Sequence, residues 1–277
     1  MDLIDTHQHL IHRQRFGYGW TTGIPPLAEG DFTLDDYRAL TTGQGVVGTL
    51  FMETGVNDAD YQAEARFAAT LVGRGGLLGQ VASCRPEAGE GFDAWLDECA
   101  DLGVRGFRRI LHVMPDELSR TDIFRSNLRR IGARGLPFDL CVLARQLPVA
   151  LELAQACDDM RIVLDHCGVP DIAGGGFEPW AEGMSALAAL PHVVCKISGL
   201  PAYAGPGATT DTLRPWIEHV VDRFGPGRLL WGGDWPVVNL GGGLPTWIGM
   251  TREVLSVLSD DERTRIGNGN ARMVYGL

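Results

Sequence analysis

The chain has 277 residues, of which 24 are basic and 35 acidic, so its formal net charge at pH 7 is −11. Binding to nucleic acid requires a basic surface, so this charge argues against a nucleic-acid partner and leaves a small-molecule substrate as the expected one. A hydrophobic content of 45% is typical of a globular protein. No run of about 18 apolar residues occurs, so no membrane span is expected.

The cysteines and the first residues of the chain indicate the cellular compartment in which the protein is expected. The six cysteines show no paired spacing of the kind found in disulfide-rich or zinc-binding domains. The beginning of the chain, Met1–His7, has neither a basic segment nor an apolar segment typical of a secretion signal. A reducing, cytoplasmic environment is therefore expected.

Short apolar runs alternate with longer amphipathic stretches along the whole chain. The runs predicted as strands are Leu3–Thr6, Val46–Met52, Leu77–Ala82, Val104–Ile110, Pro137–Leu143, Arg161–Leu164, His192–Ile197 and Arg228–Trp231. Helical periodicity predicts helices over Leu34–Thr42, Asp60–Val72, Phe92–Leu102, Ile123–Ala133, Leu147–Ala156 and Thr212–Phe224. This alternation is typical of a parallel sheet covered by helices.

The number and spacing of these units favour a (β/α)₈ TIM barrel that forms a single domain over residues 1–277, with its active site at the C-terminal ends of the strands. An open, doubly wound sheet would give the same alternation. Its nucleotide-binding form carries Gly-x-Gly-x-x-Gly after the first strand, which this chain lacks. No nucleotide cofactor is therefore expected.

Polar residues follow three of the predicted strands. His7 and His9 follow the first strand, His166 follows the sixth, and Asp234 lies between two glycines and a Trp-Pro after the eighth. Residues two apart in a strand point to the same side, so both early imidazoles can face one point. A single His-x-His arises often by chance, and an aspartate before Trp-Pro can be a turn residue. Their joint position at strand ends favours catalysis, or the binding of one Zn²⁺ or Mn²⁺ ion.

These residues also carry a family resemblance. The segments that carry it, in chain order, are Asp5–His9, Gly106–Arg108, Arg145–Pro148, Val163–Pro170, Cys195–Leu200, Leu230–Val237 and the closing Asn270–Leu277. Together they resemble the lactonase branch of the amidohydrolase superfamily, which includes L-fuconolactonases and 2-pyrone-4,6-dicarboxylate lactonases. The Arg-Gln-Leu-Pro and Cys-Lys-Ile-Ser-Gly segments are more similar to the sugar-lactone members.

The resemblance implies a barrel enzyme that hydrolyses a cyclic ester, with an aldonolactone such as L-fuconolactone as the expected substrate. Asp234 matches the acid that activates water, and Arg108 matches a substrate contact on the fourth strand. The active-site imidazoles of the family match His7, His9 and His166.

Two positions depart from the family pattern, and both bear on the identity of the substrate. His112 stands where a fuconolactonase is expected to have glutamine, and Gly233 replaces the serine usual before the acid. Binuclear members use a bridging lysine on the fourth strand. The only lysine of this chain, Lys196, lies on the seventh predicted strand, so at most one metal ion is expected, held by His7, His9 and Asp234 with or without His166. The resemblance also leaves open that the metal is dispensable, because the lactonase branch includes members that work without one.

Four further residues are candidates for substrate binding. His112 shares the strand parity of Arg108, and Trp20 offers a surface on which a sugar ring could stack. Glu53 could accept a hydrogen bond from a substrate hydroxyl or hold an arginine. Lys196 could orient the substrate or pair with Asp165.

Other functions share the same residue pattern. A metal-dependent decarboxylase or another hydrolase of the superfamily would also use the His-x-His pair, a later histidine and the final aspartate, and a 2-pyrone-4,6-dicarboxylate-type lactonase is a further alternative. A barrel that only binds a sugar acid would not need a carboxylate beside three imidazoles.

Overall fold

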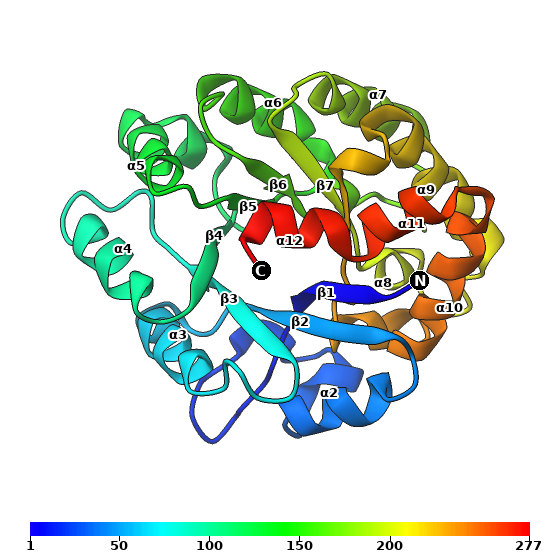
Figure 1. Cartoon of the computed structure of the whole chain (residues 1–277). Helices are drawn as coiled ribbons and strands as arrows, with labels where there is room; N and C mark the ends of the chain where they lie inside the picture. Colours follow the sequence, from blue (N-terminus) through cyan, green and yellow to red (C-terminus); the bar gives the residue numbers. More distant parts are fainter.

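The computed structural model describes residues 1–277, and its strands form a single eight-stranded parallel sheet in the order β1 to β8. Helices surround the strands in a ring, as Figure 1 shows. The strands are β1 (Leu3–Gln8), β2 (Val46–Met52), β3 (Leu77–Ser83), β4 (Val104–Ile110), β5 (Phe138–Cys141), β6 (Ile162–Leu164), β7 (Val193–Ile197) and β8 (Leu229–Trp231). The predicted (β/α)₈ barrel is confirmed.

The helices are α1 (Pro25–Ala28), α2 (Leu34–Thr41), α3 (Tyr61–Ala69), α4 (Phe92–Ala100), α5 (Asp122–Ala133), α6 (Leu147–Ala156), α7 (Phe177–Ala188), α8 (Leu200–Ala204), α9 (Thr210–Phe224), α10 (Leu244–Val254), α11 (Asp260–Thr264) and α12 (Asn270–Tyr275). Each of the six helices predicted from periodicity corresponds to one of these, with ends that differ by three residues or fewer. None of the helices combines the length and apolar character needed to cross a membrane.

Helix α12 covers one mouth of the barrel and lies near the centre of the ring in Figure 1. Its residues Ala271 and Tyr275 pack against apolar side chains from inside the strands. The members of this buried cluster from the strands are Ile4, Leu50, Met52, Val81, Val163, Val194 and Leu230. We call this cluster, together with Ala271 and Tyr275, the apolar plug. It closes the end of the barrel opposite the polar strand ends.

The barrel closes where the end of β1 meets the loop after β8. The backbone N–H of Asp234 donates to the carbonyl of His7 at 2.7 Å, and the N–H of His9 donates to the carbonyl of Trp235 at 2.8 Å. Strand β1 runs to Gln8, two residues further than predicted, because Gln8 pairs with β2 on one side and with Trp235 on the other. His7 therefore lies within the strand and not after it.

A buried carboxylate reinforces this closure. Asp5 Oδ1 accepts hydrogen bonds from the backbone N–H of His7 at 2.9 Å and of Gly233 at 2.7 Å. Asp5 Oδ2 accepts from the Tyr37 hydroxyl at 2.7 Å. A Cβ atom at Gly233 would lie 2.4 Å from Asp5 Oδ2, so any larger residue there would require Asp5 to shift.

Replacing Asp5 with alanine is expected to lower the free energy of unfolding by about 3–5 kcal/mol, because two buried N–H groups lose their acceptor. Tyr37→Phe removes only one of the hydrogen bonds to Asp5 and is expected to lower it by about 1 kcal/mol. Urea unfolding measures both values. Equal destabilisation by the two variants would contradict the role of Asp5 as the joint between β1 and the loop after β8.

A second buried acid lies on α3. Glu64 is 2% exposed, and its Oε1 accepts a hydrogen bond from the backbone N–H of Thr54 at 3.0 Å. Burial, followed by the negative charge of Glu53, raises the pKa of Glu64 to about 8. The folded chain therefore holds this proton at a pH at which the unfolded chain releases it.

The stability of the protein is consequently expected to fall as the pH rises from about 4.5 to about 8, because the folded state binds the Glu64 proton more tightly than the unfolded state. Glu64→Gln keeps the acceptor for Thr54 and cannot ionise. It is expected to be about 2–4 kcal/mol more stable than the wild type at pH 9 and similar at pH 5, in urea unfolding. The control is Glu98→Gln, which removes an exposed ion pair with Arg66 and should show no such gain. An equal stability of Glu64→Gln and wild type at pH 9 would refute the raised pKa.

Candidate active site

A pocket of about 620 Å³ opens at the C-terminal ends of the strands, where the polar residues were expected. Seven of the nine predicted site residues line it: His9, Trp20, Glu53, Arg108, His112, His166 and Asp234. The other two, His7 and Lys196, are completely buried and do not line it.

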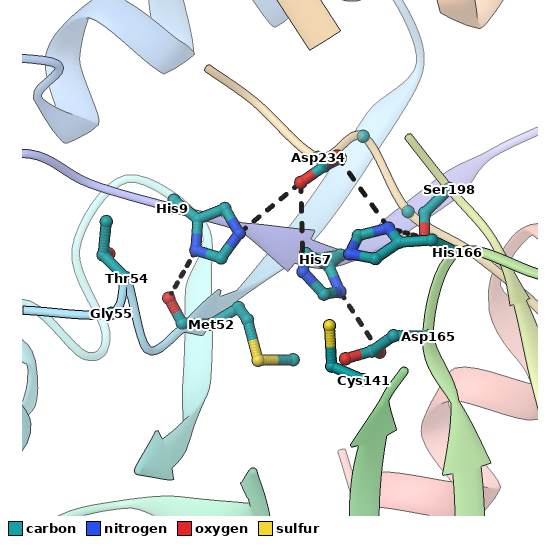
Figure 2. A network of polar contacts seen from close by, with 12 residues as sticks. His7, His9, Met52, Thr54, Gly55, Cys141, Asp165, His166, Ser198 and Asp234 are labelled. Carbon is teal, nitrogen blue, oxygen red and sulfur yellow. Dashed lines mark hydrogen bonds and ion pairs between the residues drawn. The ribbon is translucent and has the colours of Figure 1, made fainter. Parts of the chain in front are cut away.

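Asp234 lies among three imidazoles, which come from β1 and from the loop after β6 (Figure 2). Its Oδ1 atom lies 3.5 Å from Nε2 of His9 and 3.9 Å from Nε2 of His7. Its Oδ2 atom lies 3.8 Å from Nδ1 of His166. Oδ2 is buried and has no hydrogen-bond partner in the protein. Because Asp234 also lines the pocket, this carboxylate is available to a substrate or a water molecule.

Unusual backbone conformations place these groups. Asp234 has a φ of 55° and His166 a φ of 52°, a region that residues other than glycine rarely adopt. Gly199, just after β7, has a φ of 71°, and a Cβ atom there would lie 2.5 Å from Asp234 Oδ2. Gly199 therefore leaves the space that Asp234 and His166 occupy. The sequence analysis quoted this glycine only as part of a family segment and assigned it no role.

Hydrogen bonds determine the tautomers of His7 and His9. Nδ1 of His9 lies 3.0 Å from the carbonyl of Met52, which can only accept, so Nδ1 carries the proton. Nδ1 of His7 faces the Asp165 carboxylate at 3.4 Å, and its Nε2 accepts from Arg108 Nη1 at 3.1 Å. Nε2 of His9 thus presents its lone pair 3.5 Å from Asp234 Oδ1, whereas the lone pair of His7 Nε2 accepts the hydrogen bond from Arg108.

Burial favours the neutral form of two of these rings, His7 and His166. Burial, followed by the neighbouring His166, lowers the pKa of His7 well below its usual value. Burial also lowers the pKa of His166, against the opposing effect of Asp234. Burial disfavours the ionised form of Asp165, but Lys196 and then His7 hold the pKa of Asp165 well below its usual range.

This donor set fits one divalent metal ion. Nε2 of His9 and Nε2 of His7 lie 3.5 Å and 3.9 Å from one carboxylate oxygen of Asp234, and imidazole nitrogens and carboxylate oxygens are ligands that zinc prefers. The ligand atoms of His7, His9 and Asp234 lie within 4.8 Å of one another. His166 does not belong to this group but to a second one, with His7 and Asp165. His166 therefore lies on the other side of the Asp234 carboxylate.

Arg108 is held in the pocket wall by Glu53. Arg108 Nε donates to Glu53 Oε1 at 2.7 Å, and both side chains are buried. Glu53 Oε2 accepts from the backbone N–H of Gly55 at 2.9 Å. Burial opposes ionisation of Glu53, but the charge of Arg108 holds the pKa of Glu53 below its usual value. Of the two predicted alternatives for Glu53, the structure shows the ion pair with an arginine.

The remaining predicted residues lie in different surroundings. Burial, followed by the charge of Arg108, lowers the pKa of His112 to about 4. Nδ1 of His112 lies 3.3 Å from the Cys141 thiol. Trp20 is 39% exposed at the pocket rim, and its indole N–H donates to the carbonyl of Thr54 at 2.8 Å.

Of the two predicted alternatives for Lys196, the structure shows the ion pair with Asp165. The ammonium group forms ion pairs with Asp139 and with Asp165, the latter at 3.2 Å, below the floor of the pocket. Apolar periodicity shows which face of a strand a residue takes, but not its depth in the barrel. Tyr203, Arg85 and Arg109 also line the pocket and were not predicted as site residues. No pattern in the sequence singles out Tyr203 or Arg85, and Arg109 stands next to Arg108 with the opposite strand parity.

Known proteins resemble this chain over its whole length. A family model described as amidohydrolase matches residues 4–277. An L-fucono-1,5-lactonase of Burkholderia ambifaria is 32% identical over 281 residues, which cover 99% of this chain and 95% of that protein. A 4-sulfomuconolactone hydrolase of Rhizobium radiobacter is 26% identical and covers 84% of this chain and 75% of its own length.

A solved structure shows the same fold. The crystal structure of an amidohydrolase from Burkholderia multivorans with bound zinc matches with a TM-score of 0.90 and 26% identity, and covers 100% of both chains. The family match, the similarity to the Burkholderia ambifaria protein and the barrel with its histidine and aspartate site agree with one another. They confirm the resemblance noted in the sequence: the chain belongs to the amidohydrolase family of enzymes.

Proposed function

We propose that this amidohydrolase hydrolyses the ester bond of a polar lactone, an aldonolactone such as L-fucono-1,5-lactone, to the open hydroxy acid. The similarity to an L-fucono-1,5-lactonase supports the substrate class. The observation that carries the proposal is the carboxylate of Asp234, which lines the pocket and whose Oδ2 atom is buried without a hydrogen-bond partner. A carboxylate held in this way can take a proton from water.

In the proposed reaction Asp234 acts first as a base and then as an acid. It accepts a proton from the water molecule whose oxygen attacks the lactone carbonyl carbon. When the ring C–O bond breaks, Asp234 returns this proton to the departing alkoxide, so the carboxylate is regenerated. Proton transfer of this kind typically contributes about 10²–10⁴-fold to the rate.

The negative charge that develops on the carbonyl oxygen requires a donor. Arg108 is the fixed cation of the pocket wall, because Glu53 holds its guanidinium by an ion pair. His166, neutral and hydrogen-bonded through Nδ1 to Ser198 at 2.9 Å, is a second candidate donor. One such donor typically contributes about 3–4 kcal/mol to transition-state stabilisation.

His7, His9 and Asp234 would hold one divalent ion, and we propose Zn²⁺ or Mn²⁺. Bound there, the ion would polarise the carbonyl oxygen and make a water molecule more acidic. The hydrogen bond of His9 Nδ1 to the Met52 carbonyl and the contact of His7 Nδ1 with the Asp165 carboxylate at 3.4 Å orient both rings for this role.

Hydroxyl groups and the sugar ring would be recognised by the upper wall of the pocket. His112 remains neutral at physiological pH, because its pKa is about 4, and can exchange hydrogen bonds with a hydroxyl. Tyr203 lies 5.9 Å from His166, measured between ring centroids, and lines the same wall. Trp20 at the rim offers an aromatic face to the ring.

Asp234→Asn is expected to lower kcat on the preferred lactone by at least about 10²-fold, because the amide cannot accept the water proton. Release of acid from a panel of aldono-1,4- and 1,5-lactones and 2-pyrone-4,6-dicarboxylate, followed with a pH indicator, measures this loss. Asp58→Asn, at an exposed carboxylate on the rim, is the matched control. More than about a tenth of wild-type kcat in Asp234→Asn would rule out the proposed base, and no acid release from the whole panel would rule out the lactonase function.

Metal content tests the donor set separately from activity. After equilibration with Zn²⁺ and removal of excess metal, the protein is expected to contain one ion per chain. His9→Gln should lose this ion, because the ligand group then has only two members. His192→Gln, whose ring bonds the carbonyl of Ala154 far from the pocket, should keep it. Two ions per chain, or unchanged zinc in His9→Gln, would contradict the site.

A further inference from the structure

A polar layer lies between the apolar plug and the pocket. Its members are Asp139 on β5, Asp165 after β6 and Lys196 on β7, all completely buried. Asp165 and Lys196 point inward two residues beyond Val163 and Val194 of the apolar plug, as strand alternation requires. The interior of such a barrel is ordinarily packed with branched apolar side chains. Charged residues at this depth therefore need an explanation.

Lys196 joins the members of this layer. Its ammonium group pairs with Asp139 Oδ1, lies 3.2 Å from Asp165 Oδ1 and donates to the carbonyl of Thr6 at 3.0 Å. The Asp165 oxygen that Lys196 contacts is the one that faces Nδ1 of His7 at 3.4 Å. The lysine and His7 thus share a single acceptor atom.

The C-terminal helix reaches the same layer from the other end of the barrel. The hydroxyl of Tyr275 on α12 donates to Asp139 Oδ1 at 2.8 Å. The Tyr275 ring lies beneath Lys196, with its centroid 5.5 Å from Nζ. Burial, followed by the charge of Asp139, raises the pKa of Tyr275 well above its usual value, so its hydroxyl remains a donor. A continuous series of contacts therefore runs from Tyr275 through Asp139, Lys196 and Asp165 to His7.

Stability alone does not account for this layer. Replacing a buried ion pair with apolar residues of similar volume is often neutral or stabilising, because desolvation of the charges offsets their attraction. The apolar plug, one layer below, shows that this barrel interior accepts apolar side chains. The layer differs from the plug in that its side chains contact an active-site histidine.

We propose that Tyr275, Asp139 and Lys196 are positioning residues that support the active site from beneath. Asp139, held by the Tyr275 hydroxyl, pairs with Lys196. Lys196 in turn holds Asp165, so that Asp165 Oδ1 faces Nδ1 of His7 at 3.4 Å. This contact keeps the proton of the His7 ring on Nδ1 and leaves Nε2 to accept from Arg108 Nη1. The C-terminal helix is thus part of the support of a site at the opposite end of the barrel.

The test removes one hydroxyl group far from the pocket. Tyr275→Phe is expected to lower kcat about five- to tenfold and to change KM less than twofold, because the substrate pocket itself is untouched. The matched control is Tyr18→Phe, which also deletes a buried tyrosine hydroxyl, here the acceptor for the backbone N–H of His12. The control should retain wild-type kcat. An equal loss of kcat in both variants, or no loss in Tyr275→Phe, would overturn the proposal.

A spectroscopic measurement tests the same proposal without relying on the proposed function. The chain has seven histidines, so [¹⁵N]histidine labelling gives few signals, and His7→Gln identifies that of His7. In the wild type Nδ1 of His7 should be protonated and Nε2 should not. In Tyr275→Phe the two ¹⁵N shifts should move toward each other as the tautomers mix, whereas Tyr18→Phe should leave them unchanged. Unchanged His7 signals in Tyr275→Phe would overturn the proposal even if no lactone is hydrolysed.

A second variant shows whether the effect passes through Asp139. Asp139→Asn keeps the volume of the side chain and an oxygen acceptor for Tyr275. It removes the negative charge that pairs with Lys196. It should mix the His7 tautomers as Tyr275→Phe does. The double variant should be no worse than the stronger single variant, because both act on one series of contacts. Independent, additive effects of the two substitutions on kcat would contradict the series, and the His7 signals decide the question if either single variant is unstable.

Discussion

The joint between the first strand and the loop after the last strand is the constraint on which the rest of this site depends. Two backbone hydrogen bonds link His7 to Asp234 and His9 to Trp235, and Asp5 holds the same two segments by its carboxylate. His7, His9 and Asp234 form this joint and are also the residues proposed to supply the chemistry. Asp5 and Trp235 lie within two residues of them in the chain. Closing the barrel and assembling the site are therefore one structural event.

The rings gain their chemical character from partners that the substrate does not touch. Met52 fixes the tautomer of His9, and Arg108 and Asp165 fix that of His7. The unprotonated Nε2 atoms of His9 and His7 lie 3.5 Å and 3.9 Å from one oxygen of Asp234, and the other oxygen has no hydrogen-bond partner. One oxygen of this carboxylate can in this way bind a metal ion while the other accepts a proton. This division suits hydrolysis of an ester that has no charged leaving group.

Much of this arrangement could be predicted from the sequence, because strand alternation and strand-end positions follow from local patterns. The barrel, the imidazoles and Asp234 belong to this class. Depth along a strand was not predictable, so the sequence left open whether Lys196 orients the substrate in the pocket or pairs with Asp165 below it, as it does. Contacts between segments that lie far apart in the chain could likewise not be predicted from the sequence. Tyr203 reaches the pocket from a short helix, and Tyr275 reaches the barrel interior from the last helix; neither position follows from a local pattern.

The joint between β1 and the loop after β8 also has a consequence for the order of folding. The hydrogen bond from Thr6 to Trp231 spans 225 residues, and that from Gly233 to Asp5 spans 228. Contacts so distant in the chain form late, because a long loop must close before they stabilise anything. During synthesis the first strand emerges early and has no partner on this side until almost the whole chain has followed. His7 and His9 therefore lie on an exposed edge of the incomplete sheet until the last strand is in place. Only then does the barrel close and the active site form.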